Sequence, residues 1–119
     1  MEKILEDTLL FDFYGELLTD NQKRVYEDSV LNDLSLSEIA DDSSISRQGV
    51  RDTLVKAKSA LASYEEKLGL VRKFTEIQEA VDRIRELSDY VLGDVENVDN
   101  VVLNVNLIRD MTDQISDKL

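Results

Sequence analysis

The sequence predicts an all-α protein, in which a helix-turn-helix core is followed by a long C-terminal helical hairpin. Proline is absent and glycine occurs only at positions 15, 49, 69 and 93, so few points along the chain can interrupt a helix. Apolar residues recur at helical spacing in every segment, and no stretch of four or more residues alternates strictly as a half-buried strand does. We therefore expect helices and no strands.

Length and composition indicate how the chain is organised. At 119 residues with 42% apolar content, it can bury a modest core as one domain with an appended helical hairpin. We expect a helical helix-turn-helix domain over residues 1–69. Residues 70–119 are expected to form the hairpin, which serves either packing or oligomerisation.

The first two helices are predicted from an apolar stripe and a capping box. The first helix is expected over residues 3–18, with a broad apolar stripe made of Leu5, Leu9, Leu10, Phe13, Tyr14 and Leu17. Thr19 and Gln22 fit a capping box that satisfies N–H groups at the start of the second helix. That helix is expected to end at about Asp33 and to turn four side chains inward, Val25, Tyr26, Val30 and Leu31.

A second capping box begins the next helix. Ser35 and Glu38 have the required spacing, and they precede a short helix that contains Ile39 and Ala40 and ends at the polar turn of residues 41–44.

The longest helix of the core is predicted over residues 47–68. Ser46 is a favourable N-cap because its hydroxyl can accept a hydrogen bond from an N–H group of the first turn. Gly69 can end the helix in a left-handed conformation.

Two coiled-coil-like apolar seams follow, with a break at Gly93 and Asp94. The first seam consists of Phe74, Ile77, Val81, Ile84 and Val91, with Ser88 as its polar member. The second consists of Val98, Val101, Val105, Ile108, Ile115 and Leu119, with Thr112 as its polar member. We expect two long helices that pack as an antiparallel hairpin.

The segment of residues 36–54 has the pattern of a helix-turn-helix. Its miniature core is expected from the apolar positions Leu36, Ile39, Ala40, Ile45, Val50 and Leu54. Ala40 is informative because two helices that cross steeply at a short turn need a small residue where their backbones approach. With Val50 and Leu54 inward, five polar side chains point outward at the start of the second helix: Ser46, Arg47, Gln48, Arg51 and Asp52.

These outward positions are the ones that enter a major groove in helix-turn-helix proteins. Arginine can contact guanine edges in bidentate fashion and glutamine can contact adenine, so Arg47, Gln48 and Arg51 are candidates for base contacts. Ser46, Lys56 and Lys58 are candidates for holding phosphates. Residues 46–58 carry four cations and one anion, a local net charge of +3, within a chain whose net charge is -12. The alternative is an ordinary helical corner with a solvated charged face.

Composition excludes several classes of protein. The chain has no cysteine and no histidine, so disulfides, thiolate metal sites and the commonest general base are absent. We predict no enzymatic activity, no catalytic residue, no cofactor and no metal site. The acidic N-terminal residues do not resemble a signal peptide, and the longest apolar runs are far shorter than a membrane span. We therefore expect a cytoplasmic protein without membrane insertion.

Several separate motifs lie within about residues 9 to 70. They are Leu10–Tyr14, Leu17–Asp20 with Gln22, Ser35 and Leu36 with Glu38–Ala40, Ser46–Gln48 with Val50, Tyr64 with Glu65, and Lys67 with Leu68. Together they resemble the YlxM-like helix-turn-helix family. The same module is similar, more loosely, to the DNA-binding fourth region of sigma-70-type factors. The sequence departs from the family pattern at Ser44, where glycine is usual, and at Arg51, where an aromatic residue is more familiar.

The resemblance implies a bacterial cytoplasmic protein whose gene lies beside those of the signal recognition particle and which regulates or assists that export pathway. Our leading hypothesis is a regulatory protein that binds DNA, with components of the particle as further candidate partners. One recognition helix buries little surface, so we expect a homo-oligomer, with a dimer favoured. The competing hypothesis is a non-enzymatic adaptor that binds a protein or ribonucleoprotein of the export machinery and no DNA; the net charge of -12 favours it.

Overall fold

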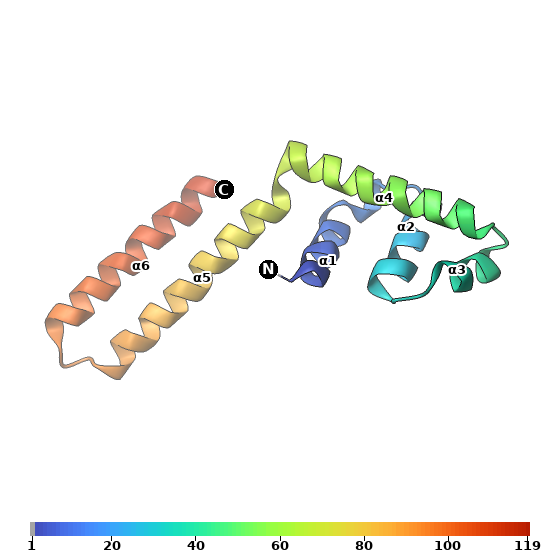
Figure 1. Cartoon of the computed structure of the whole chain (residues 1–119). Coiled ribbons are helices and arrows are strands. Elements are labelled where there is room, and N and C mark those ends of the chain that lie inside the picture. Colours follow the sequence, from blue (N-terminus) through green and yellow to red (C-terminus); the bar gives the residue numbers. More distant parts are fainter. Residues whose placement is uncertain (1) are drawn as a thin grey trace. The chain divides into compact units, whose positions relative to one another are not determined.

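The computed structural model describes residues 2–119 and shows the all-α fold that the sequence predicts (Figure 1). No strand occurs among these residues. The α-helices are α1 (Lys3–Tyr14), α2 (Asp20–Tyr26), α3 (Leu36–Ser43), α4 (Arg47–Leu68), α5 (Leu70–Gly93) and α6 (Val98–Lys118).

The chain divides into two compact units. The first ends at Val71 and the second begins at Arg72. The first unit therefore contains α1 to α4 and the first residues of α5, and the second contains the rest of α5 together with α6.

The first helix is shorter than predicted. α1 ends at Tyr14, and residues 15–17 continue as a tighter 3-10 turn, η1 (Gly15–Leu17). Gly15 permits this turn to lie against an aromatic ring, since a Cβ atom added there would meet ring carbons of Phe11 at 3.2 Å. A continuous α-helix to Leu18 was therefore the wrong expectation.

The apolar stripe of this segment also differs from the prediction. Tyr14 and Leu18 are buried, whereas three members of the predicted stripe, Leu5, Phe13 and Leu17, are exposed. A 3-10 turn advances each side chain by one third of a turn, so the residues after Tyr14 no longer follow the period of an α-helix. Burial of Leu18 takes the place of the predicted burial of Leu17.

The second segment begins as predicted. The Thr19 hydroxyl accepts a hydrogen bond from the Gln22 backbone N–H at 3.2 Å, and the Gln22 side-chain oxygen accepts one from the Thr19 N–H at 3.1 Å, which confirms the capping box. After Tyr26 the chain continues as a π-helix, η2 (Glu27–Leu31), which ends slightly before the predicted residue. Among the four side chains expected inward, Val25 and Tyr26 are buried, and Val30 and Leu31 are half-buried.

The second capping box is confirmed as well. The Ser35 hydroxyl accepts from the Glu38 N–H at 3.1 Å, and the Glu38 carboxylate accepts from the Ser35 N–H at the same distance. α3 continues through Ser43, so most of the residues predicted as a polar turn are its last helical turn. Ser44 then adopts a left-handed conformation with φ of 58°.

Two apolar clusters form the core of the first unit. The larger cluster contains the buried residues Tyr14, Leu18, Tyr26, Ala57, Leu61 and Val71. The smaller one contains Val25, Ile39 and Val50, which come from α2, α3 and α4. Leu54 on α4 packs against both clusters. The long helix α4 therefore joins the two clusters into one scaffold.

A buried tyrosine ties α1 to the end of α4. The Tyr14 hydroxyl donates to a Glu65 carboxylate oxygen at 2.7 Å and accepts from the Leu70 N–H at 3.0 Å. The same Glu65 oxygen accepts from the Val71 N–H at 2.9 Å. Gly69 is left-handed, with φ of 62°, and confirms the predicted C-cap of α4. Tyr14 and Glu65 thus satisfy N–H groups at the start of α5, which no preceding turn of that helix can serve.

In the second unit α5 and α6 form an antiparallel hairpin, with a short connection after Gly93 where the sequence predicts a break (Figure 1). The Asn97 side chain caps α6 by accepting from the Asn100 N–H at 3.2 Å. Near the open end, the Lys118 ammonium lies 3.3 Å from a Glu76 carboxylate oxygen.

The predicted seams of the hairpin are only partly correct. Leu87, which the first seam omitted, is the most buried side chain of residues 72–119, at 2% exposed. Asn104 and Met111 are half-buried on α6. Several predicted seam residues are exposed instead, namely Phe74, Val81, Val98, Val105, Thr112 and Leu119. The spacing of apolar residues shows that a helix has a buried face. Residues on the neighbouring faces recur with the same spacing, so spacing alone does not show which of these stripes is buried.

Candidate nucleic-acid interface

The helix-turn-helix is held by the smaller cluster of the first unit. Val25, Ile39 and Val50 are fully or almost fully buried, and the partly buried residues around them are Leu34, Leu36, Ala40, Ile45 and Leu54. All six residues predicted for the miniature core therefore belong to this cluster. Close packing of α2, α3 and α4 fixes the direction in which the first turns of α4 present their side chains.

The start of α4 depends on two small residues. Ser46 is the N-cap, as predicted, and its hydroxyl accepts from the Gly49 N–H at 3.0 Å. A Cβ atom at Gly49 would come within 2.7 Å of a methyl carbon of Ile45, which is closer than real Cβ contacts. The turn can therefore fold tightly over α4 only because residue 49 lacks a side chain.

The five outward positions are exposed in the structure, as their helical phase requires: Ser46, Arg47, Gln48, Arg51 and Asp52. The Gln48 amide nitrogen donates to an Asp52 carboxylate oxygen at 2.9 Å, one turn further along α4. This bond orients the Gln48 side chain and occupies one oxygen of Asp52. In this arrangement Asp52 positions a neighbouring donor, and its negative charge faces the same solvent as the two arginines.

Three of these residues line one open hollow. Arg47, Gln48 and Arg51 surround it together with Leu36 from the start of α3. Leu36 was predicted only as a core residue, yet it is half-buried and contributes an apolar edge beside the arginines. The hollow therefore combines two cations, an amide and an aliphatic side chain, which are the groups that contact base edges and thymine methyl groups.

Helical phase separates the two candidate lysines of α4. Arg51 follows Arg47 by about one turn and Lys58 follows it by about three turns, so the three cations lie along one side of the helix. Lys56 follows Arg47 by roughly two and a half turns and therefore lies on the opposite side. The structure brings Arg47, Arg51 and Lys58 into one line and leaves Lys56 outside it.

The cations of this line are not neutralised within the chain. Among residues 2–119, Arg47, Arg51 and Lys58 form no ion pair, whereas Lys23 pairs with Glu16 and Lys118 with Glu76. Cations without an internal ion pair remain available to an external anion. The side of α4 that carries them is a local reversal of the acidic balance of the chain.

The helices offer neither a metal cluster nor a membrane span among the described residues. In the part of the chain that the structure describes, no cluster of three or more acidic side chains could hold a metal ion. Across residues 2–119, every helix is either too short or too polar to span a bilayer.

Comparison with known proteins identifies relatives along most of the chain. The family model UPF0122, described as "Putative helix-turn-helix protein, YlxM / p13 like", matches residues 1–101. A UPF0122 protein of Thermoanaerobacter sp. (strain X514) is 45% identical over 109 residues, which cover 84% of this chain and 93% of that protein. A UPF0122 protein of Thermoanaerobacter pseudethanolicus is 54% identical over 79 residues, covering 66% and 68% of the two chains. The UPF0122 protein YlxM of Bacillus subtilis (strain 168) is 42% identical over 88 residues, covering 74% and 80%.

Proposed function

Because the chain belongs to the UPF0122 family of YlxM / p13-like helix-turn-helix proteins, we propose that it is a regulatory protein that binds DNA through the first turns of α4. One observation carries the proposal: Arg47, Gln48 and Arg51 line one exposed hollow, together with Leu36, which packs against the buried cluster that holds α4. No catalytic residue and no cofactor has a part in this function.

The proposed contacts follow from the geometry of the side chains. Arg47 and Arg51 reach guanine edges in the major groove, and Gln48, oriented by Asp52, reaches an adjacent base. Ser46 and Lys58 contact phosphates on either side of the groove. Lys56 is expected to contribute least, because it lies half a turn away from Arg47 around the helix.

A dimer is part of the proposal. Specific protein–DNA interfaces usually bury ~1,000 Å² or more of protein surface, which one recognition helix does not supply. The hairpin offers a surface for association, since Val98, Val102 and Val105 are all exposed along α6. Two copies joined there would present two recognition helices to two half-sites.

The place of this protein in the cell is a further part of the proposal. The resemblance to YlxM-like proteins implies a role in the signal recognition particle pathway, either through control of its genes or through contact with its components. Family membership supports this part of the proposal.

The decisive experiment titrates a labelled duplex pool with the protein at a series of salt concentrations. Fluorescence anisotropy reports the fraction of duplex bound. The wild type is compared with the Arg47→Ala, Arg51→Ala double variant. A control, the Lys67→Ala, Lys73→Ala double variant, removes the same charge from exposed positions outside the hollow. We expect saturable binding that weakens steeply with salt, that is lost in the arginine variant and that persists in the control.

The adaptor hypothesis predicts the opposite pattern, and two observations favour it: the net charge of -12 and the exposed carboxylates of Asp41 and Asp42 on α3. An adaptor would show no duplex binding even at low salt. It would also keep its protein or ribonucleoprotein partner when Arg47 and Arg51 are replaced. Equal losses in the arginine variant and the lysine control would indicate nonspecific attraction and contradict readout by α4.

A further inference from the structure

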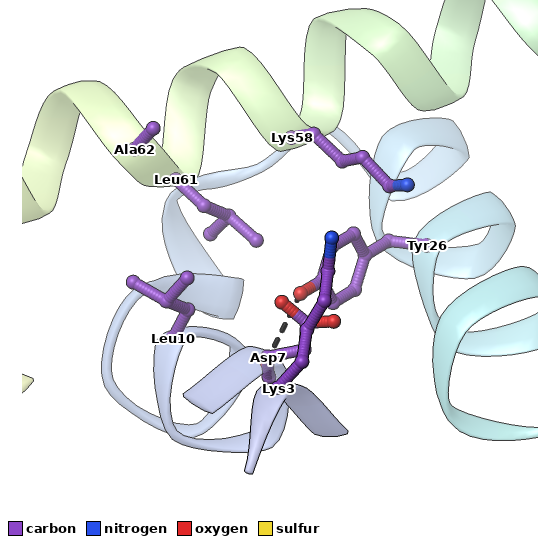
Figure 2. A pocket seen from close by; sticks show the side chains of 7 residues that line it. All are labelled: Lys3, Asp7, Leu10, Tyr26, Lys58, Leu61 and Ala62. Carbon is purple, nitrogen blue, oxygen red and sulfur yellow. Dashed lines mark hydrogen bonds between the residues drawn. The ribbon is translucent and has the colours of Figure 1, made fainter. Parts of the chain in front are cut away.

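A second hollow lies on the first unit, away from the one that Arg47 lines. Its volume is about 200 Å³, and it is lined by Lys3, Asp7, Leu10, Tyr26, Lys58, Leu61 and Ala62. Figure 2 shows Lys58 reaching down from α4 and Lys3 rising from α1, with the Tyr26 ring beside them. The hollow thus brings together two lysines that are far apart in the sequence.

The size of the hollow limits what it can hold. It is somewhat larger than the ~150 Å³ cavity that accommodates a benzene molecule, and smaller than the ~300 Å³ at which pockets for small organic ligands begin. One compact group, such as a phosphate, fits this space, and a whole nucleotide does not.

The polar groups of the hollow favour an anion. Two ammonium groups face one carboxylate, that of Asp7, so the lining carries a net charge of +1. Neither Lys3 nor Lys58 forms an ion pair among the residues that the structure describes. Both lysines are also exposed and can move toward a ligand at the mouth.

The tyrosine adds no negative charge to the hollow. Its hydroxyl donates to the backbone carbonyl oxygen of Asp7 at 3.0 Å, which Figure 2 shows as a dashed line. Burial, followed by the nearby Asp7 charge, raises the pKa of Tyr26 far above its usual value, so the hydroxyl remains protonated at neutral pH. An anion at the mouth therefore meets two ammonium groups and the single carboxylate of Asp7, with no further negative charge from Tyr26.

The position of Lys58 connects this hollow with the proposed DNA surface. Lys58 lies on the same side of α4 as Arg47 and about 16 Å further along the helix axis. The major groove is ~12 Å wide, so where α4 crosses the groove, Lys58 lies beyond its edge, at the sugar-phosphate backbone.

We propose that the hollow between Lys3 and Lys58 binds one phosphate group, and that this phosphate belongs to the backbone of the duplex whose groove receives Arg47 and Arg51. The second half of this inference rests on the proposed function. Lys3, which no helix-turn-helix pattern in the sequence indicates, then becomes a DNA contact contributed by α1.

The first test measures how steeply duplex binding depends on salt. The slope of log K against log salt is negative, and loss of one neutralised phosphate reduces its steepness by about 0.9. We expect this decrease in the Lys3→Gln, Lys58→Gln double variant and a smaller change in Lys67→Gln, Lys73→Gln, which loses the same charge elsewhere. Melting curves of both variants establish that they are folded. Equal changes in the two variants, or none in the first, overturn the assignment to the DNA backbone.

The second test asks whether free phosphate occupies the hollow. Inorganic phosphate is titrated at constant ionic strength, without DNA, while the amide resonances of Asp7 and Tyr26 are followed by NMR. Saturable shifts in the wild type that vanish in the lysine double variant, together with an unchanged salt slope, would reassign the hollow to a free phosphate and overturn the DNA source.

The two proposals fail in different ways. A wild type that binds no duplex contradicts the proposed function, and the NMR titration alone then decides whether the hollow binds phosphate. The other outcome is that the wild type binds duplex, the lysine variant has the same salt slope, and phosphate causes no NMR shifts. That outcome contradicts phosphate binding in the hollow and leaves the proposed role of Arg47 and Arg51 intact.

Discussion

The two units of the chain differ in how completely their helices are covered. Of the ten buried apolar residues that the structure describes, nine lie in the unit that ends at Val71, and only Leu87 lies in the hairpin. The first unit therefore has a core that can hold the exposed side chains of α4 in fixed directions. In the hairpin, Val98, Val102 and Val105 are exposed to solvent. Association with a second copy would bury these apolar side chains. Under the proposed function, DNA recognition thus falls to the first unit and association to the hairpin.

The largest expected effect is on the core of the helix-turn-helix. Ile39 is 2% exposed and shares a buried cluster with Val25 and Val50, so Ile39→Ala should lower the free energy of unfolding by about 2–5 kcal/mol, as large-to-small core substitutions do. Urea unfolding followed by circular dichroism measures the change. Val55→Ala, at an exposed aliphatic position of α4, is the control and should stay within about 0.5 kcal/mol. Similar losses in both variants would contradict the contrast between core and surface.

A smaller effect is expected from the hydrogen-bonded tyrosine of the same unit. Tyr14→Phe removes the donor to Glu65 and leaves the Leu70 N–H without its acceptor. Because hydrogen bonds to a charged group are stronger than neutral ones, we expect a loss of about 2 kcal/mol in the free energy of unfolding. Tyr64→Phe keeps the ring that packs beside Tyr14 and serves as the control. An unchanged stability of Tyr14→Phe would mean that water replaces the hydroxyl without cost.

Alkaline pH should lower the free energy of unfolding of the first unit. Burial raises the pKa of both Tyr14 and Tyr26 in the folded state, with the Glu65 hydrogen bond as the next cause for Tyr14. The neutral hydroxyl is therefore favoured on folding, so the stabilisation is complete below the unfolded pKa near ~10 and is lost as the pH rises above it. The slope approaches about 1.4 kcal/mol per pH unit for each tyrosine.

Urea unfolding between pH 9 and pH 11 measures this slope. The Tyr26→Phe variant should show a shallower decline than the wild type, because one of the two titrating groups is gone. Parallel curves for the two proteins would assign the alkaline loss to other groups.

The smallest effect on protomer stability is expected in the hairpin. Val102 and Val105 are exposed, so a Val102→Asp, Val105→Asp double variant should change the unfolding of the first unit by less than about 0.5 kcal/mol. If the hairpin joins two copies, the same variant should sediment as a monomer under conditions in which the wild type is a dimer. Identical sedimentation of a dimeric wild type and its variant would place the contact elsewhere.

Much of the fold is readable from local sequence. Thr19 with Gln22 and Ser35 with Glu38 form the predicted capping boxes, Ser46 begins α4 and Gly69 ends it. These signals act over three or four residues, because a helix end needs partners for its own unpaired N–H and C=O groups. The miniature core was predicted for a related reason: its members lie within one short segment, and helical phase alone separates inward from outward positions.

The contacts that depend on distant residues were not readable in this way. Leu87 and Asn104 replaced predicted seam residues because the rotation of each helix about its axis is set by the helix packed against it. The 3-10 turn after Tyr14 reflects the packing of Leu18 in the larger cluster, which local spacing does not encode.

The candidate sites also differ in whether they depend on local or on distant residues. Composition and spacing predicted the cations of α4, including the alignment of Arg47 with Arg51, from the chain alone. Lys58 and Lys3 are 55 positions apart, and they line the same hollow only because α1 packs against α4, which the sequence alone did not indicate. Local sequence determines where a helix starts and ends and which of its faces points outward. The segments that pack beside that face are determined by the free energy gained when distant segments bury apolar surface against each other.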